Sequence, residues 1–224
     1  MLRTVRTFNQ YRGHRRIDGP EIEPVTLCEI KEQLRISGTN EDALLAMYIA
    51  AARQQIEEMT GLALITQQFT LTLDQFINSR RAWWDGTGTG AIGYVENAHG
   101  YNAIHLPRYR LQSVDAMRVY SIDGVAESVS LSDFVIDTEQ QPGRLVLRSG
   151  ATWPVALQSA NAIEIDYTAG FGDTGADVPA ALKLAVMQMA ASLYQHRGDE
   201  CTVADALRIS GAHSIVRSYR VARI

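Results

Sequence analysis

The residues of this chain that could do chemistry are few and dispersed. Four candidate metal ligands stand close together near the C-terminal end: His196, Asp199, Glu200 and Cys201. This group lacks the paired spacing of a structural zinc site, and it follows a predicted helix, where solvated polar residues are common. Cys201 would act as a nucleophile only with a histidine beside it in space, which no motif of the sequence provides. We therefore predict no catalytic residue and no metal site.

A glycine-rich run at residues 88–93, Gly-Thr-Gly-Ala-Ile-Gly, matches the G-x-G-x-x-G motif of dinucleotide-binding proteins. That motif binds pyrophosphate where it links a strand to a helix. Here Trp83 and Trp84 precede it in place of a buried strand, and residues 94–100 have no helical pattern. We therefore predict no cofactor, and we interpret residues 78–103 as a long loop whose two tryptophans could contact a partner. The alternative is a small-ligand enzyme in which this loop forms a lid.

Composition narrows the class of protein further. The chain is 46% hydrophobic and 21% charged, which is ordinary for a globular protein with a sizeable core. Its net charge of −4 argues against a dedicated high-affinity nucleic-acid binder. The two cysteines, Cys28 and Cys201, are too few and too far apart for a disulfide framework. No apolar run has the length of a membrane span, and no apolar block follows the N-terminal arginines as in a signal peptide.

Residues 177–197 have the clearest periodicity in the chain. Apolar side chains recur there at every third or fourth position over about five helical turns. Asp177 is a candidate N-cap and Gly198 a candidate stop. We predict a core helix, in which Met187 and Met189 pack against neighbouring elements.

An earlier segment predicts a helical hairpin. Thr26 and Glu29 have capping-box spacing, so a first helix is expected from Thr26 to residues 37–38. A second helix is expected to start from a cap at Thr39 or Asn40 and to end at Gly61. Together, residues 25–68 and 173–198 are predicted to form a helical core.

Between these helices, residues 69–172 have the pattern of β structure. Apolar and polar residues alternate at 69–73 and 163–167, and Asp123-Gly124 is a strong two-residue hairpin signal. We therefore predict an α+β fold: a helical core, made of a helical hairpin and a long C-terminal helix, with an inserted antiparallel β domain.

Both ends of the chain are basic. Residues 1–24 contain glycines and prolines that interrupt regular elements, and they predict a flexible arm or one that orders on an acidic partner or a phosphate backbone. The arginines of this arm are Arg3, Arg6, Arg12, Arg15 and Arg16. Residues 199–224 are predicted to contain a short helix at 203–207 and then a docking tail that combines arginines with apolar anchors.

The order of these segments resembles the head–tail connector, or adaptor, family of long-tailed phages and phage-like gene transfer agents. The resemblance covers most of residues 25–220 and is strongest to members with a β insertion. The matching segments are VTLCEIKEQLRI (25–36), EDALLAMYIAAARQQIEEMTGLALI (41–65), LPRYRLQSVDAMRVY (106–120), PGRLVL (142–147), WP (153–154), IEIDYTAGFG (163–172), VPAALKLAVMQMAASLYQHRG (178–198) and SYR (218–220). The arginine-rich arm and the 78–103 loop depart from the family pattern.

This resemblance implies a structural, non-enzymatic role. Such proteins form a ring, usually of twelve copies, between the portal and the stopper or tail-completion protein, in the neck of a particle assembled in the bacterial host cytoplasm. Double-stranded DNA passes through the ring without sequence specificity. The family's C-terminal segment reaches toward the portal, a role that would here fall on Ile215, Val216, Arg217, Tyr219, Arg220 and Arg223. A third interpretation is a sheet-based partner-binding module without ring symmetry.

Overall fold

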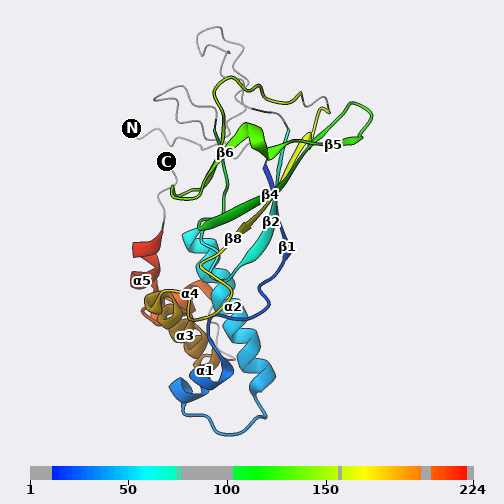
Figure 1. Ribbon diagram of the computed structural model, residues 1–224. Coiled ribbons are helices and arrows are strands. Elements are labelled where there is room, and N and C mark those ends of the chain that lie inside the picture. Colours follow the sequence, from blue (N-terminus) through cyan, green and yellow to red (C-terminus); the bar gives the residue numbers. More distant parts are fainter. Residues whose placement is uncertain (1–11, 75, 77–102, 156–157, 198–202, 221–224) are drawn as a thin grey trace, which may run out of the picture. The chain divides into compact units, whose positions relative to one another are not determined.

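The computed structural model describes residues 12–74, 76, 103–155, 158–197 and 203–220, shown as coloured ribbon in Figure 1. Its fold is α+β, as predicted, and the chain divides into two compact units. The β unit is Met1–Asp18, Gln68–Pro107 and Leu111–Thr168; the helical unit is Gly19–Gln67, Arg108–Arg110 and Ala169–Ile224. The N-terminal segment therefore belongs to the β unit, and the C-terminal segment belongs to the helical unit.

Five helices lie in the part of the helical unit that the structure describes. They are α1 (Leu27–Leu34), α2 (Asp42–Thr60), α3 (Ala180–Gln195), α4 (Val203–Ile209) and α5 (Ala212–Tyr219). α3 is apolar around much of its circumference because it packs against all four of the others. Its fully buried side chains include Leu182, Val186 and Met189, while Met187 packs at the margin of the same core. The helix that the sequence periodicity singled out is thus the centre of this unit.

The ends of these helices follow local chemistry. The capping box at α1 is confirmed: the Thr26 hydroxyl accepts from the Glu29 N–H at 3.2 Å, and the Glu29 carboxylate accepts from the Thr26 N–H at 2.7 Å. α2 begins after Glu41, so the predicted cap at Thr39 or Asn40 is wrong, and no side chain caps it. α2 ends at Gly61 as predicted, with φ of 78°.

The start of α3 also differs from the prediction. The helix begins at Ala180, after Pro179, and Asp177 does not cap it. Instead, the Asp177 carboxylate accepts from the N–H and hydroxyl of Thr174, at 2.9 and 2.7 Å. These bonds lower the pKa of Asp177 and close the turn that precedes the helix.

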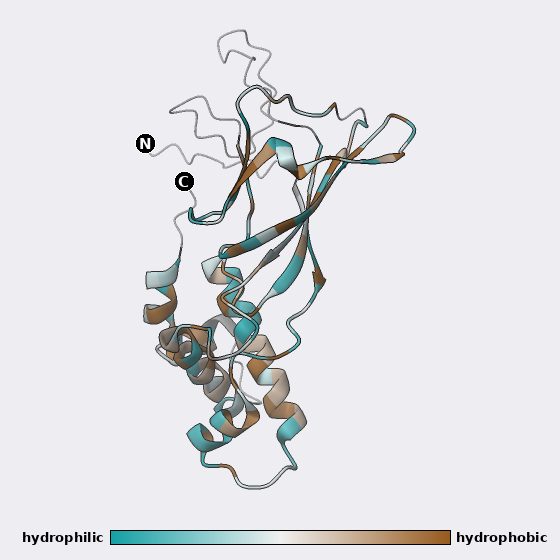
Figure 2. Cartoon of the chain, in the orientation of Figure 1, coloured by the Kyte–Doolittle hydropathy of each residue, from teal (hydrophilic) through white to brown (hydrophobic). Residues whose placement is uncertain are grey.

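The β unit contains a five-stranded sheet, in the order β1-β2-β8-β4-β5, and a three-stranded sheet, in the order β3-β7-β6. The strands are β1 (Arg12–Asp18), β2 (Gln67–Leu73), β3 (Ala103–His105), β4 (Leu111–Tyr120), β5 (Ala126–Ser128), β6 (Phe134–Asp137), β7 (Arg144–Leu147) and β8 (Ile163–Ala169). A short 3-10 helix, η1 (Leu131–Asp133), precedes β6. β8 alternates buried and half-buried residues along its length, and Figure 2 shows the change of hydropathy along β4. The Asp123-Gly124 turn joins β4 to β5, as the hairpin signal predicted.

The prediction that residues 1–24 form an arm without regular structure is wrong for residues 12–18. This segment is β1, an edge strand that pairs antiparallel with β2 and places His14 opposite Leu71. The His14 ring stacks on Phe69 at 5.1 Å, and its Nε2 lies 2.9 Å from the hydroxyl of the buried Tyr167. An edge strand can be polar along most of its length because its partner strand supplies the hydrogen bonds, so its sequence lacks the usual alternation.

Candidate interaction surfaces

The structure assembles no catalytic constellation among the residues it describes. Within those ranges, no three histidine, cysteine, aspartate or glutamate side chains are grouped so that they could hold a metal ion. Of the four candidate ligands only His196 is described, and its Nδ1 lies 2.9 Å from the carbonyl oxygen of Ser192. The G-x-G-x-x-G run and residues 78–102 of the predicted loop, with Trp83 and Trp84, lie outside the described residues, as do Arg3, Arg6 and Arg223, whereas Ala103 begins β3.

A polar cluster lies on the five-stranded sheet. Arg118 donates to Asp166 at 2.6 Å, and the Tyr120 hydroxyl donates to Glu164 at 2.7 Å. The bond to Asp166 raises the pKa of Arg118, and the bond to Glu164 raises the pKa of Tyr120. The cluster therefore links β4 to β8 through side-chain hydrogen bonds and ion pairs.

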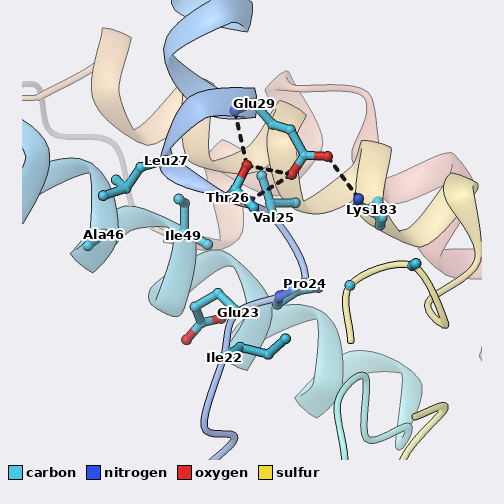
Figure 3. A pocket seen from close by; sticks show the side chains of 12 residues that line it. Ile22, Glu23, Pro24, Val25, Thr26, Leu27, Glu29, Ala46, Ile49 and Lys183 are labelled. Carbon is cyan, nitrogen blue, oxygen red and sulfur yellow. Dashed lines mark hydrogen bonds and ion pairs between the residues drawn. The ribbon is translucent and has the colours of Figure 1, made fainter. Parts of the chain in front are cut away.

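A pocket of about 470 Å³ opens on the helical unit (Figure 3). The segment before α1 forms one side of it, and α2 and α3 form others. Its lining is mostly apolar and comprises Ile22, Glu23, Pro24, Val25, Thr26, Leu27, Glu29, Ala46, Ile49, Gly175, Ala176 and Lys183. The small side chain of Ala46 leaves space that a longer one would fill. The distance along the chain between residues 22, 46 and 183 explains why sequence patterns gave no sign of this pocket.

The charged side chains of this pocket already have partners. Lys183 donates to Glu29 at 2.9 Å, and Glu29 also accepts from Thr26, as the dashed lines in Figure 3 mark. The bond from the Thr26 N–H, followed by the bond from Lys183, lowers the pKa of Glu29. Glu23 accepts from the buried guanidinium of Arg53 at 2.8 Å. The pocket therefore offers mainly apolar contact, in contrast to small-molecule sites, where converging polar groups orient the ligand.

The C-terminal segment is folded where it was predicted to be a docking tail. α4 confirms the predicted short helix, but the next residues form α5, whose Val216 is 1% exposed and packs in the helical core. Val216 is therefore unavailable as a docking anchor. Ile215 and Tyr219 are half-buried against the same core, whereas Arg217 and Arg220 are exposed. Apolar residues at 212, 215, 216 and 219 have helical spacing, a signal that the sequence interpretation overlooked.

Two further surfaces lie on the β unit. Arg15 and Arg16 are exposed on β1, while the side chain of Arg12 is outside the described residues. Ile122 and Val125 flank the tip of the β4–β5 hairpin and are 77% and 61% exposed. Both β-branched side chains therefore face solvent at this hairpin.

The fold defines a class: an α+β protein with a helical unit and a β unit. Comparison with known proteins adds a family. Residues 24–84 match the family described as phage gp6-like head-tail connector protein. This match confirms the resemblance that the sequence indicated, over a segment that contains α1 and α2.

Solved structures match over almost the whole chain. A chain from the neck of an empty gene transfer agent particle, computed with C6 symmetry, has a TM-score of 0.69 and 24% identity, with 95% of this chain and 97% of that chain covered. A chain from the virion of a native gene transfer agent particle has a TM-score of 0.67 and 24% identity, with 94% and 96% covered.

A chain from the neck of a native particle, computed with C12 symmetry, has a TM-score of 0.67 and 22% identity, with 95% and 97% covered. At these identities, the three matches show a shared fold. No curated protein sequence matches the chain. In the ranges that the structure describes, none of the helices is long and apolar enough to span a bilayer.

Proposed function

We propose that this chain is a structural head–tail connector in the neck of a tailed phage or gene transfer agent particle. The match of residues 24–84 to the head-tail connector family carries the proposal, because this segment contains two helices of the core. The fold shared with chains of gene transfer agent particles supports it over nearly the full length. The role is mechanical and requires no reaction, cofactor or metal.

In this proposal the chain acts as a ring between the portal and the stopper or tail-completion protein. Twelve copies would agree with the C12 symmetry applied to one of the similar necks. Double-stranded DNA would pass through the ring without sequence-specific contacts. Identical copies give each weak contact many repeats, so a ring can bind firmly through surfaces that are individually modest.

Removal of the gene from a strain that produces the particles tests this function. We expect filled heads and separate tails, because the joint between them is missing, and we expect the full-length chain to restore joined particles. Electron microscopy of purified particles provides the measurement. Normally tailed particles in the absence of the chain would overturn the proposal.

The portal contact is proposed to involve α5. Its Arg217 and Arg220 are exposed, and Ile215 and Tyr219 leave part of their surface accessible beside them. Replacing both arginines, Arg217→Glu with Arg220→Glu, should reduce retention of the chain on purified portal-bearing heads. Ser214→Glu changes an exposed position on the same helix and is the control. Equal retention of the arginine variant and the control would remove α5 from the portal contact.

A further inference from the structure

Among the residues that the structure describes, four strands stand at the edges of the two sheets: β1 and β5 in one sheet, and β3 and β6 in the other. An edge strand has outward backbone N–H and C=O groups that its own sheet leaves without a partner, so another strand can pair with it. β3 is not available in this way, because Ala103 and Ile104 are buried in the core.

The edge of β6 is largely covered by the side chain of Arg148. Its Nε donates to the carbonyl oxygens of Ser132 and Phe134, at 2.9 and 3.1 Å. The N–H of Phe134 donates to the carbonyl of Leu131. Because backbone direction alternates along an antiparallel strand, these bonds occupy the outward groups of Phe134, and within the four residues of β6 only those of Ile136 remain. β6 is therefore a poor site for a partner strand.

β5, by contrast, has an open edge. All three of its residues are exposed, in the hairpin that projects from the sheet (Figure 1). The backbone groups of Val125 and Val129 bond back to the β4 side of this hairpin, each at 2.9 Å. By the same alternation, the backbone groups of Ala126 and Ser128 point away from β4, where the described residues place no partner on them.

β1 is the other open edge. It forms the opposite border of the same five-stranded sheet and is seven residues long. Arg15, Arg16 and Ile17 are all exposed on it. Of the four edges, β1 and β5 are thus the two that a further strand can reach, and both belong to one sheet.

These two edges carry opposite charge. β1 contains Arg12, Arg15 and Arg16 against one acid, Asp18. Residues 119–130, which include β5, contain two acids and no lysine or arginine. Like charges opposite each other destabilise a sheet, so β1 paired with β1, or β5 paired with β5, would be unfavourable. The charges favour pairing of β1 with β5, and these strands lie on opposite borders of one sheet, so the partner must be a second copy.

The charges at these edges are not neutralised within the described part of the chain. The two acids of the hairpin, Asp123 and Glu127, make no ion pair there, and Arg15 makes none either. Glu127 and Arg15 are both exposed. They are therefore available to charges on another molecule.

The side chains at the two edges also match in the face of the sheet to which they point. Thr70 and Arg118 both bond to Asp166, so they lie on one face. Arg15 is opposite Thr70 in the β1–β2 pair, and Ser128 is opposite Arg118 in the β4–β5 pair, which places both on that face.

The residues beside them, Arg16 and Glu127, point to the other face, because side chains alternate along a strand. An antiparallel pair with Arg16 opposite Glu127 would therefore also place Arg15 opposite Ser128. The sheet would continue from one copy to the next with its faces preserved.

We propose that β1 of one copy adds antiparallel to β5 of the next copy, so that the five-stranded sheets of neighbouring copies are continuous. This inference rests on the proposed connector function, which requires contacts between identical copies. In such strand addition the backbone bonds supply affinity and the side chains select the partner. Two different edges make a head-to-tail contact, and contacts of this kind close into rings when the rotation between copies allows it.

Cross-linking in assembled particles tests the contact directly. The chain carries Arg15→Cys and Ser128→Cys in a background with Cys28→Ser and Cys201→Ser. A short bis-maleimide reaches opposite and diagonal cross-strand positions, which are up to about 8 Å apart. Denaturing gels should then show a ladder of linked copies. Each single cysteine variant is a control and should give no linked species; dimers from Arg15→Cys alone would mean that β1 pairs with β1, and the proposal would be wrong.

A charge exchange tests which side chains select the partner. Glu127→Arg and Arg16→Glu should each lower the amount of chain in purified particles by about fivefold, because each places like charges opposite one another. The two changes combined should restore incorporation, since the pair is then reversed. A double variant as poor as either single variant would contradict the pairing of these residues.

A proline tests the backbone bonds. Ala126→Pro removes an N–H that points away from β4, so the hairpin keeps its own bonds while its edge is blocked. Incorporation should fall about tenfold, with the melting temperature of the isolated chain unchanged. Ala126→Ser keeps the N–H and is the matched control. Equal incorporation of the two variants would argue against strand addition at β5.

The outcomes separate this contact from the function on which it rests. If heads and tails join only when the chain is present, but no ladder forms and the charge and proline variants are incorporated normally, the strand contact is wrong and the connector function stands. If particles without the chain are normally tailed, the connector function itself is wrong.

Discussion

At the residue scale, one buried carboxylate joins several parts of the helical unit. The Oε1 atom of Glu57 accepts from the Leu64 N–H at 2.9 Å and from Gln67 at 2.7 Å. Its Oε2 atom accepts from Arg53 at 2.8 Å. Since Arg53 also binds Glu23, the network connects α2 with the segment before α1 and with the segment after α2. Each buried charge has a partner, which is the condition under which such groups are tolerated.

Loss of this carboxylate should be costly. We expect Glu57→Ala to lower the free energy of unfolding by about 3–5 kcal/mol, because it leaves the Arg53 charge buried with fewer partners. The adjacent Glu58 has a 70% exposed side chain and one ion pair to Arg108, so Glu58→Ala should cost about 1 kcal/mol or less. Urea unfolding of both variants provides the measurement. Similar losses in the two would contradict the assignment of Glu57 to a buried network.

The α1 capping box should give part of the stability a dependence on pH. The folded state lowers the pKa of Glu29 below its ordinary value of 4.5, chiefly through the bond from the Thr26 N–H. Its contribution is therefore fully present above the unfolded pKa and is lost as pH falls through the lowered, folded-state pKa. A cap of this kind is worth about 1 kcal/mol. Unfolding curves of the native chain and Glu29→Gln should differ near pH 7, begin to converge below pH 4.5 and meet only below the lowered, folded-state pKa; a constant difference would argue against this origin.

At the element scale, close backbone packing at the end of β8 explains why the Tyr-Thr-Ala-Gly-Phe-Gly sequence has a glycine at position 170. Gly170 has φ of +154°, and a Cβ atom there would lie 2.5 Å from the backbone nitrogen of Thr66. The Gly170 N–H donates to the carbonyl of Arg110 at 2.9 Å, and the Thr66 N–H donates to the carbonyl of Gly172 at 3.0 Å. The backbones of three segments, around Thr66, Arg110 and Gly170, therefore pack directly against one another inside the helical unit. There is no space for a side chain at Gly170.

A single methyl group should disrupt this junction. We expect Gly170→Ala to destabilise the chain by about 3 kcal/mol or more, because neither the backbone conformation nor the space accommodates it. Gly19→Ala is the matched control, since nothing lies within 4 Å of the added Cβ at that position. Thermal unfolding followed by circular dichroism compares them. A Gly170→Ala melting temperature equal to that of Gly19→Ala would contradict the close approach.

Elements whose signals are local could be predicted from the sequence. The Thr26 and Glu29 side chains make the hydrogen bonds at the start of their own helix. The left-handed conformation of Gly61 and the Asp123-Gly124 turn depend only on neighbouring residues in the chain. β1 could not be predicted in this way, because Ile17 is its only aliphatic residue and its pairing comes from β2. The sequence of α5 has helical spacing of apolar residues. We predicted that these residues bind an external partner, but in the structure they pack against α3 and α2.

The candidate site was harder to predict than the fold. The pocket depends on where α2, α3 and the segment before α1 come together, and this long-range packing leaves no periodic signal. The arginines of the C-terminal segment were visible in sequence, and two of them, Arg217 and Arg220, are exposed as a contact role requires. Val216, just before them, is buried in the core, and its residue type alone does not distinguish a core position from a docking surface.

At the scale of the whole molecule, charge should decide how the proposed connector treats DNA. A net charge of −4 gives little general attraction to a polyanion. Binding of proteins to duplex DNA without sequence specificity depends mainly on cations that displace counterions from phosphates. Many of the described arginines and lysines are held in ion pairs, among them Arg53, Arg118, Lys183 and Arg197. A ring of such chains would let DNA move past it.

The isolated chain should therefore leave duplex DNA essentially unbound at 150 mM salt, with a dissociation constant of about 100 µM or weaker. A variant with four exposed acids reversed supplies the contrast: Glu21→Lys, Glu32→Lys, Glu127→Lys and Glu139→Lys. Each reversal adds two charges, so the net charge rises from −4 to +4, and binding should appear and weaken steeply with added salt. Electrophoretic mobility shift of a random duplex measures both proteins. Micromolar binding by the unaltered chain would mean that its arginine-rich ends bind DNA. The proposal that DNA passes through the ring without appreciable affinity for it would then be wrong.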